Sequence, residues 1–325
     1  MDKNFPLTQE SVQNLWIAVS DPVRFAKRIP GEQNANPFHL KCSELRRNGT
    51  RLLDLTVSNP TECGFGYLNP DLLTPLQNLD NLIYSPDPRG LLSCRKAISD
   101  YYAAKGIHVE TDQIFVTTNT SEAYSFVFKL LLNPGDAVLA PEPSYPLLDY
   151  LAVFNDVQTV RKSDAQKIKA ALLVHPNNPT GNYVSLEERK NFNDLARKNG
   201  WSLIVDEVFL DYPLKNNSLK KQSFAGNQDV LTLTLSGISK VLGLPQMKLS
   251  WIVVNGPEKE KHEALNRLEI LADTYLSAST PIQNALTEWM KKIELIQEEI
   301  RSRIQKNYET LLNESKKNLS VYVPE

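Results

Sequence analysis

The sequence predicts an α/β protein: a mostly parallel central sheet with helices on both faces, plus a partial smaller domain. The first observation is that short apolar runs rich in β-branched residues alternate with segments of helical apolar spacing. The second is that these runs end in turn-forming or polar residues. Such alternation builds βαβ units, which place successive strands parallel and pack the connecting helices against the sheet.

The elements are expected in a definite order. Strands are predicted at QIFVTT (113–118), AVLAPEP (137–143), the start of ALLVHPNNPTG (171–181), WSLIVDEVF (201–209), VLTLTLS (230–236) and WIVV (251–254). A helix is predicted over 120–132, where apolar residues return at helical spacing. Another is predicted over 185–200, because Ser185 and Glu188 form a capping-box signal and Gly200 supplies a stop.

The ends of the chain differ from its middle. Residues 51–280 are expected to form the large α/β domain, and residues 281–316 read as long helix. Residues 1–50 and 281–325 are expected to belong to a smaller domain that is truncated, because the chain stops at VYVPE soon after this helix. A helix so placed would leave apolar side chains poorly covered, namely Leu295, Ile296 and Ile300.

Composition excludes several classes of function. The 325 residues carry a net charge of −2 and are 41% apolar and 23% charged, which is ordinary for a globular protein and gives no basic footprint for nucleic acid. No apolar run is long enough to span a membrane, and the N-terminus does not resemble a signal peptide. Few and unclustered cysteines (Cys42, Cys63 and Cys94) argue against a disulfide framework or zinc site and favour the cytoplasm.

Polar clusters follow the predicted strands. In open α/β sheets, ligands bind outside the carboxyl ends of the strands, so these clusters are the place to look for a site. They are NTSE (119–122), PSY (143–145), NNPTG (177–181), DEVF (206–209) and SGISK (236–240). Thr120 and Ser121 lie at the junction of a predicted strand and a predicted helix, a position that suits phosphate binding. The alternative is that they only cap the helix.

Asp206 and Lys240 are the most informative of these residues. Asp206 follows an apolar strand, so its carboxylate is expected to be buried and to face a cation; a structural ion pair or cap is the alternative. Lys240 lies in a small-residue loop, where a partly desolvated amine becomes a nucleophile for aldehydes; the alternative is a solvated surface lysine. Tyr145 could stack on a flat ligand or join the core, and Asn178 could offer an amide or only form a turn.

Together these groups match what pyridoxal 5′-phosphate requires. Its phosphate needs backbone and hydroxyl donors, its ring needs a face, its ring nitrogen needs an anion, and its aldehyde needs an amine. The small residue Gly237 is expected to let the backbone approach the cofactor closely.

The chain resembles the class I and II aminotransferases, which are fold-type I pyridoxal-phosphate enzymes. The resemblance runs from DLTVSNPT (54–61) to TYLSASTPIQNA (274–285), and its most specific parts are NNPTG, DEVFLDY and SGISKVLGLPQMKLSW. It implies that Lys240 forms the Schiff base, Asp206 pairs with the ring nitrogen, Tyr145 stacks on the ring and Asn178 binds the phenolic oxygen. It assigns the phosphate to four hydroxyl residues and one lysine: Thr120, Ser121, Ser236, Ser239 and Lys248.

The resemblance also implies substrates and a partner. The reaction would move an amino group between an amino acid and a 2-oxo acid, with Lys240 as the base that shifts a proton at the α-carbon. Ser58 and Asn59 resemble the segment that lies along the substrate. Tyr84 resembles a tyrosine that reaches the phosphate of a neighbouring subunit, which implies a homodimer with shared active sites.

The sequence departs from the family pattern in ways that leave alternatives open. Phe209 stands where many relatives have a tyrosine that donates to the cofactor, and Lys248 replaces the usual arginine. The link over 154–174 is short, and no residue can be assigned the role of the arginine that binds the substrate carboxylate in the family's C-terminal lobe. The alternatives are a pyridoxal-phosphate-dependent carbon–sulfur lyase on the same fold, or a catalytically impaired truncated homologue.

Overall fold

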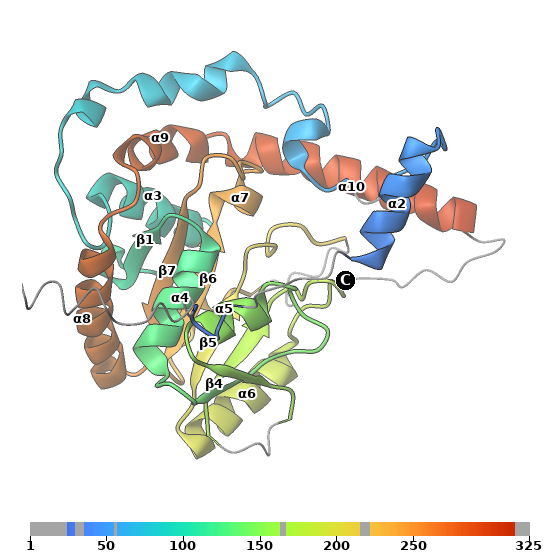
Figure 1. Ribbon diagram of the computed structural model, residues 1–325. Helices are drawn as coiled ribbons and strands as arrows, with labels where there is room; N and C mark the ends of the chain where they lie inside the picture. The colour runs from blue at the N-terminus through green and yellow to red at the C-terminus, as the bar shows by residue number, and fades with distance from the viewer. Residues whose placement is uncertain (1–24, 30–35, 55–56, 163–166, 215–221, 316–325) are drawn as a thin grey trace, which may run out of the picture. The chain divides into compact units, whose positions relative to one another are not determined.

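The computed structural model of this protein describes residues 25–29, 36–54, 57–162, 167–214 and 222–315 (Figure 1). The chain divides into two compact units, Met1–Leu53 and Asp54–Glu325. In the first, α2 (Pro37–Arg47) begins at Asn36, whose side chain accepts the N–H of Phe38. The division into a cofactor domain over 51–280 and flanking parts of a smaller domain stays a prediction.

The second unit is built on one seven-stranded sheet. Its strands are β1 (Ile114–Thr117), β2 (Ala137–Leu139), β3 (Gln158–Val160), β4 (Ile168–Val174), β5 (Ser202–Asp206), β6 (Thr232–Gly237) and β7 (Ser250–Asn255). Their order is β1-β7-β6-β5-β4-β2-β3, and β7 runs antiparallel to both of its neighbours while the other pairs are parallel. The predicted mostly parallel sheet is confirmed, and the short link over 154–174 supplies the edge strand β3.

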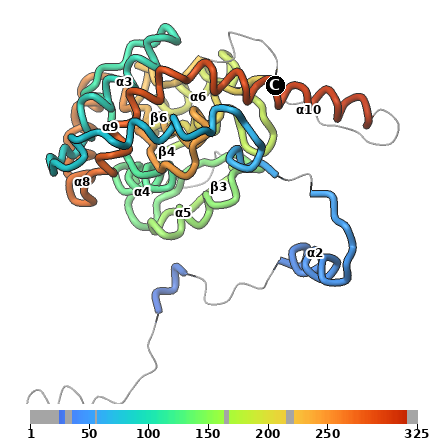
Figure 2. The backbone as a smooth tube through the Cα atoms, turned by 90° about the horizontal axis from the view of Figure 1, so that it is seen from above, coloured from blue at the N-terminus to red at the C-terminus, as the bar shows by residue number. Residues whose placement is uncertain are grey.

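Helices cover both faces of the sheet, as predicted. They are α3 (Leu92–Ala103), α4 (Thr120–Leu131), α5 (Leu148–Phe154), α6 (Leu186–Asn199), α7 (Ile238–Val241), α8 (Glu258–Tyr275), α9 (Thr280–Met290) and α10 (Ile293–Ser315). On one face, α4, α5 and α8 enclose a single apolar cluster, and α4 lies beside α8 (Figures 1 and 2). On the opposite face, α3, α9 and α10 enclose a second cluster and α6 a third.

Short 3₁₀ helices complete the unit. They are η1 (Pro60–Glu62), η2 (Pro70–Gln77), η3 (Leu79–Leu82), η4 (Thr111–Gln113) and η6 (Phe224–Gly226). Helix α6 has the predicted capping box: the Ser185 hydroxyl accepts the N–H of Glu188, whose carboxylate accepts the N–H of Ser185. Gly200 ends this helix in the left-handed conformation, with φ of 67°. Within the described ranges, no helix combines the length and apolarity needed to cross a membrane.

The predicted helix over 281–316 is two helices. Helices α9 and α10 are separated at 291–292. The expectation of uncovered apolar residues was wrong for Ile296 and Ile300, which are 0% and 8% exposed and belong to the cluster shared with α3 and α9. It holds for Leu295, which is 66% exposed. The difference arises because the break lets α10 lay one face on the core while the other face stays in solvent.

Candidate active site

The predicted polar clusters converge at one edge of the sheet. Adjacent parallel strands bring their carboxyl ends together there, because Val174 at the end of β4 pairs with Asp206 at the end of β5. A second set of paired residues crosses β1, β7 and β6: Thr117 pairs with Ser250, and Ser250 pairs with Gly237. The helix start at 120 and the turn at 238 therefore lie at neighbouring points of this edge.

Asp206 is a buried carboxylate, as predicted. Side chains alternate along β5, so Asp206 lies on the same face as Ile204, which packs in the cluster under α4. The side chain is 6% exposed and accepts hydrogen bonds from the Tyr124 hydroxyl at 2.7 Å and the Val208 N–H at 3.1 Å. Burial raises the pKa of Asp206, although both hydrogen bonds and the charge of Lys240 oppose this. Among the described residues, Asp206 has no ion-pair partner within salt-bridge distance.

Lys240 lies near Asp206 in the short helix α7. Its amine lies 5.3 Å from the centroid of the Phe209 ring, so the lysine meets the aromatic face of this side chain. Burial lowers the pKa of Lys240; the charge of Asp206 opposes this and that of Lys248 adds to it. A lysine in this setting loses its proton more easily, which makes the amine a better nucleophile and base.

Hydroxyl groups gather between the start of α4 and the end of β6. Asn119 caps α4 through its side chain, so Thr120 and Ser121 belong to the first turn, where backbone N–H groups point outward. The Thr120 hydroxyl lies 3.1 Å from that of Ser250. The Ser236 hydroxyl is buried without a partner among the described residues, but alternation along β6 directs it to the face of the sheet opposite α4. An anion placed here would meet donors from two elements and the positive end of α4.

Tyr145 lies near both the first turn of α4 and Asp206. Its pKa is raised by burial and by the charge of Asp206, while a hydrogen bond with Ser121 lowers it. The neighbouring turn lies close, because the Asn177 amide donates to the Pro143 carbonyl at 3.2 Å. Asn178 is half-buried in the same turn.

Gly237 has a packing role in addition to the expected one. A Cβ atom at this position would lie 2.2 Å from the hydroxyl oxygen of Ser250 and 3.0 Å from the carbonyl of Leu249. Glycine is therefore required for the close approach of β7. This packing brings Ser250 against the residue that precedes the turn of Lys240.

Not every predicted site residue joins this cluster. Asn59 uses its side chain locally, accepting the N–H of Thr61 and donating to Glu62, and Ser58 is exposed. Tyr84 is 79% exposed. Lys248 is exposed, but it is close enough for its charge to act on Lys240. Ser239 is half-buried in α7.

Sequence reasoning missed Tyr124 and Ser250. Tyr124 is 1% exposed and places its hydroxyl on the buried carboxylate of Asp206. The signal was present, because Tyr124 follows Thr120 by four positions and so shares its helix face. A single hydroxyl within an otherwise apolar stripe needs a buried partner.

Glu207, the residue next to Asp206, points to the opposite face of the sheet. It is 1% exposed, and its carboxylate accepts the Ser223 hydroxyl and the Phe224 N–H. Burial raises the pKa of Glu207 from 4.5 to about 7, although both bonds and the charges of Arg189 and Lys105 oppose the rise. Alternation along the strand thus separates two carboxylates that are adjacent in sequence.

The raised pKa of Glu207 predicts how stability changes with pH. The folded state keeps the Glu207 proton up to a pKa of about 7, whereas the unfolded chain loses it near 4.5. This contribution to stability is complete below pH 4.5 and is lost as the pH rises to about 7, at roughly 1.4 kcal/mol per pH unit. Glu207→Gln should remove this slope in urea unfolding measured across the window. An unchanged slope in the variant would contradict the assignment.

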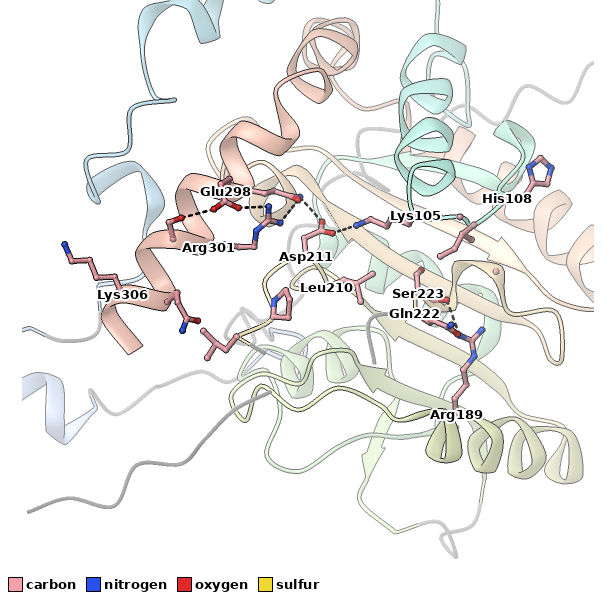
Figure 3. A pocket seen from close by; sticks show the side chains of 18 of the residues that line it. Lys105, His108, Arg189, Leu210, Asp211, Gln222, Ser223, Glu298, Arg301 and Lys306 are labelled. Atoms are coloured by element: carbon pink, nitrogen blue, oxygen red, sulfur yellow. Dashed lines mark hydrogen bonds and ion pairs between the residues drawn. The ribbon is translucent and has the colours of Figure 1, made fainter. Parts of the chain in front are cut away.

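A large cavity lies apart from the cluster. It measures about 1180 Å³, and its lining includes Lys105, Asp211, Ser223 and Arg301 (Figure 3). None of the predicted site residues lines it. The candidate site is therefore defined by its buried charges and donors at the sheet edge.

A family model and curated relatives match most of this chain. The model of the family described as aminotransferase class I and II matches residues 78–325. The glutamate-pyruvate aminotransferase AlaA of Haemophilus influenzae is 31% identical over 268 residues, which are 77% of this chain and 66% of that protein. The chain thus spans slightly less than two thirds of the length of this relative.

Solved structures give the same picture. The alanine aminotransferase of Pyrococcus furiosus superposes with a TM-score of 0.75 at 25% identity, covering 89% of this chain and 79% of that one. A mutant aspartate aminotransferase of Thermus thermophilus has a TM-score of 0.79 at 20% identity, covering 94% and 83%. Because the identity is only 20%, this second match is evidence for the fold alone.

Proposed function

Because the chain belongs to the class I and II aminotransferase family, whose members depend on pyridoxal 5′-phosphate, we propose that it transfers an amino group between an amino acid and a 2-oxo acid. The observation that carries the proposal is that Lys240 and Asp206 lie close enough for each charge to act on the other. Both charges are withdrawn from water at the same edge of the sheet, and each shifts the pKa of the other. A lysine and a carboxylate so placed suit an aldehyde and a protonated ring nitrogen.

The residues at the edge fit the cofactor. The Thr120 and Ser250 hydroxyls lie 3.1 Å apart at the start of α4, and a phosphate oxygen would accept hydrogen bonds from them. The first turn of α4, with Thr120 and Ser121, offers backbone donors to the same phosphate. Asp206 is buried without an ion pair among the described residues, and a protonated ring nitrogen would supply the missing cation.

We assign the chemistry to a small set of groups. When bound, the cofactor supplies an aldehyde that takes the substrate nitrogen and a ring that accepts the electrons of the α-carbon. Lys240 would hold the aldehyde carbon and, once freed, take the α-proton, a role that its lowered pKa favours. Asp206 would keep the ring nitrogen protonated, and Tyr145 and Asn178 would orient the ring. The phosphate would be held by three hydroxyl residues and one lysine: Thr120, Ser121, Ser239 and Lys248.

Tyr124 is expected to tune Asp206. Its hydroxyl stabilises the carboxylate over the neutral acid, so Tyr124→Phe should raise the pKa of Asp206 and weaken its hold on a charged ring nitrogen. The loss of one hydrogen bond to a charged group predicts a fall in cofactor affinity of roughly 10–100-fold. Equilibrium titration with pyridoxal 5′-phosphate measures it. Tyr150→Phe, which changes a surface tyrosine, is the control, and equal affinities in the two variants would contradict the role.

The relatives suggest the first substrates to test. The names of the matched enzymes mention glutamate, pyruvate and alanine, so we propose glutamate as amino donor and pyruvate as acceptor. The test incubates the protein with cofactor, glutamate and pyruvate and measures alanine and 2-oxoglutarate. Formation of both in equal amounts supports the proposal. Release of ammonia and pyruvate from a sulfur-bearing amino acid, without transfer, would instead favour the lyase alternative.

We also propose that the protein works as a homodimer in the cytoplasm. The segment around η3 exposes Leu79, Leu82, Ile83 and Tyr84, which are each more than 60% exposed, and such patches favour association. The cysteines are unpaired, which fits a reducing compartment. Light scattering should give twice the chain mass, and Leu82→Asp should shift it toward the monomer. A monomeric wild-type protein would refute the dimer.

A further inference from the structure

The turn that carries Lys240 is held by side chains from distant elements. Helix α7 has four residues, so its last carbonyl groups find few partners within the helix. The Tyr212 hydroxyl donates to the Lys240 carbonyl at 2.7 Å, and the Tyr67 hydroxyl donates to the Gly243 carbonyl at 3.0 Å. The position of the lysine backbone therefore depends on groups outside the turn.

Gln297 provides a further restraint, from α10. It is 6% exposed, and a buried amide is costly unless its donors are satisfied. Its amide nitrogen donates to the Val241 carbonyl at 3.0 Å and to the Asp211 carboxylate at 2.9 Å. An amide group has two N–H donors, so both are used. One side chain thus joins two separate segments.

The second segment is the turn that follows β5. Asp211 follows Asp206 by five residues and is 7% exposed. It also pairs with Lys105 (Figure 3) and accepts the Tyr101 hydroxyl at 2.8 Å, so its position is fixed from several directions. A bridge from Asp211 to the turn after Lys240 therefore couples the segment of the carboxylate to the segment of the amine.

We infer that Gln297 is a positioning residue, which holds the Lys240 turn at a fixed place relative to Asp206. The inference rests on the proposed function only for its catalytic consequence, because the bridge itself is a property of the folded chain. Because Gln297 belongs to α10, a shift of this helix along its axis would displace the Val241 carbonyl, which directly follows Lys240.

A purely stabilising role is the competing explanation, and the chain offers a matched control. Gln283 in α9 is a second buried glutamine, 1% exposed, that accepts the Leu91 N–H and donates to the Ala278 carbonyl. It makes no hydrogen bond to α7. Gln297→Met and Gln283→Met each remove one buried amide of the same size, so both should lower the melting temperature.

The first measurement is amide hydrogen exchange of the cofactor-free proteins. Gln297→Met should speed amide exchange of Leu242, Gly243 and Leu244 about tenfold more than it speeds exchange in the rest of the sheet. This is the effect expected from losing one buried hydrogen bond. Gln283→Met should leave these amides as in the wild type. Equal exchange in both variants, or none above the global change, would overturn the inference.

The second measurement uses the cofactor-loaded proteins. Gln297→Met should shift the pH midpoint of the absorbance change of the lysine-bound cofactor by roughly half a unit or more and lower kcat with little change in KM. Tyr212→Phe, which removes the bond to the Lys240 carbonyl, should act in the same direction and serves if Gln297→Met does not fold. A protein that binds no cofactor would defeat the proposed function while the exchange experiment still decides the bridge.

Discussion

Lys240→Ala should abolish turnover while leaving the fold intact. The variant loses both the amine that holds the cofactor and the base that moves the α-proton. Loss of a positioned general base alone costs roughly 10²–10⁴-fold in rate, and loss of the covalent link adds to it. The side chain is half-buried and its amine makes no hydrogen bond or ion pair among the described residues, so its removal should leave the melting temperature nearly unchanged. Transamination rate and thermal unfolding together check this.

Lys248→Ala separates the two lysines. If Lys248 binds phosphate, its loss should weaken cofactor binding, yet the cofactor should still attach to Lys240. Excess cofactor should then restore much of the rate in Lys248→Ala but none in Lys240→Ala. A Lys240→Ala variant that keeps more than a few per cent of wild-type activity under these conditions would contradict the assigned role.

Asp206→Asn should cause the second large loss. The carboxamide keeps the shape of the side chain but cannot balance a protonated ring nitrogen. Leaving one member of a buried charge pair without its partner costs about 3–5 kcal/mol, which corresponds to a fall in kcat of roughly 200–5,000-fold. The Tyr124 hydroxyl can still donate to the amide oxygen, so the geometry should persist. The rate of the half-reaction with glutamate measures the effect.

The same substitution should stabilise the cofactor-free protein. Burial raises the pKa of Asp206 above its unfolded value, so the stability tied to its proton is present at acid pH and is lost as the pH rises. Asparagine carries no such cost, and the variant should therefore melt at a higher temperature than the wild type near pH 7. The difference should shrink as the pH falls toward the ordinary pKa of aspartate, about 3.9. A cofactor-free variant that is less stable at pH 7 would show that the carboxylate supports the fold.

The parts of the site that sequence reasoning placed correctly depend on local patterns. The almost purely apolar strand before Asp206 predicts that this carboxylate is buried, and the structure confirms it. The helix over 186–199 was predicted from Ser185, Glu188 and Gly200, whose hydrogen bonds and dihedral angle are all local. The parallel sheet also followed from the alternation of strands and helices.

The parts that were missed depend on contacts between distant segments. The hydrogen bond from Tyr124 to Asp206 spans 82 residues, and no local pattern fixes the register that creates it. The burial of Ile296 depends on the break before α10. The two lysines at 291–292 give no sequence signal for that break. The need for Gly237 comes from Ser250 on the neighbouring strand. Such contacts are properties of tertiary packing, which overrides local propensity.

The most direct test is chemical. The protein is purified with pyridoxal 5′-phosphate, freed of excess cofactor, reduced with borohydride and digested, and the modified peptide is identified by mass spectrometry. We predict stoichiometric modification of Lys240 and of no other lysine, and its loss when glutamate is added before reduction. Absence of retained cofactor, or modification scattered over exposed lysines, would contradict the central claim that this edge of the sheet is a pyridoxal-phosphate site.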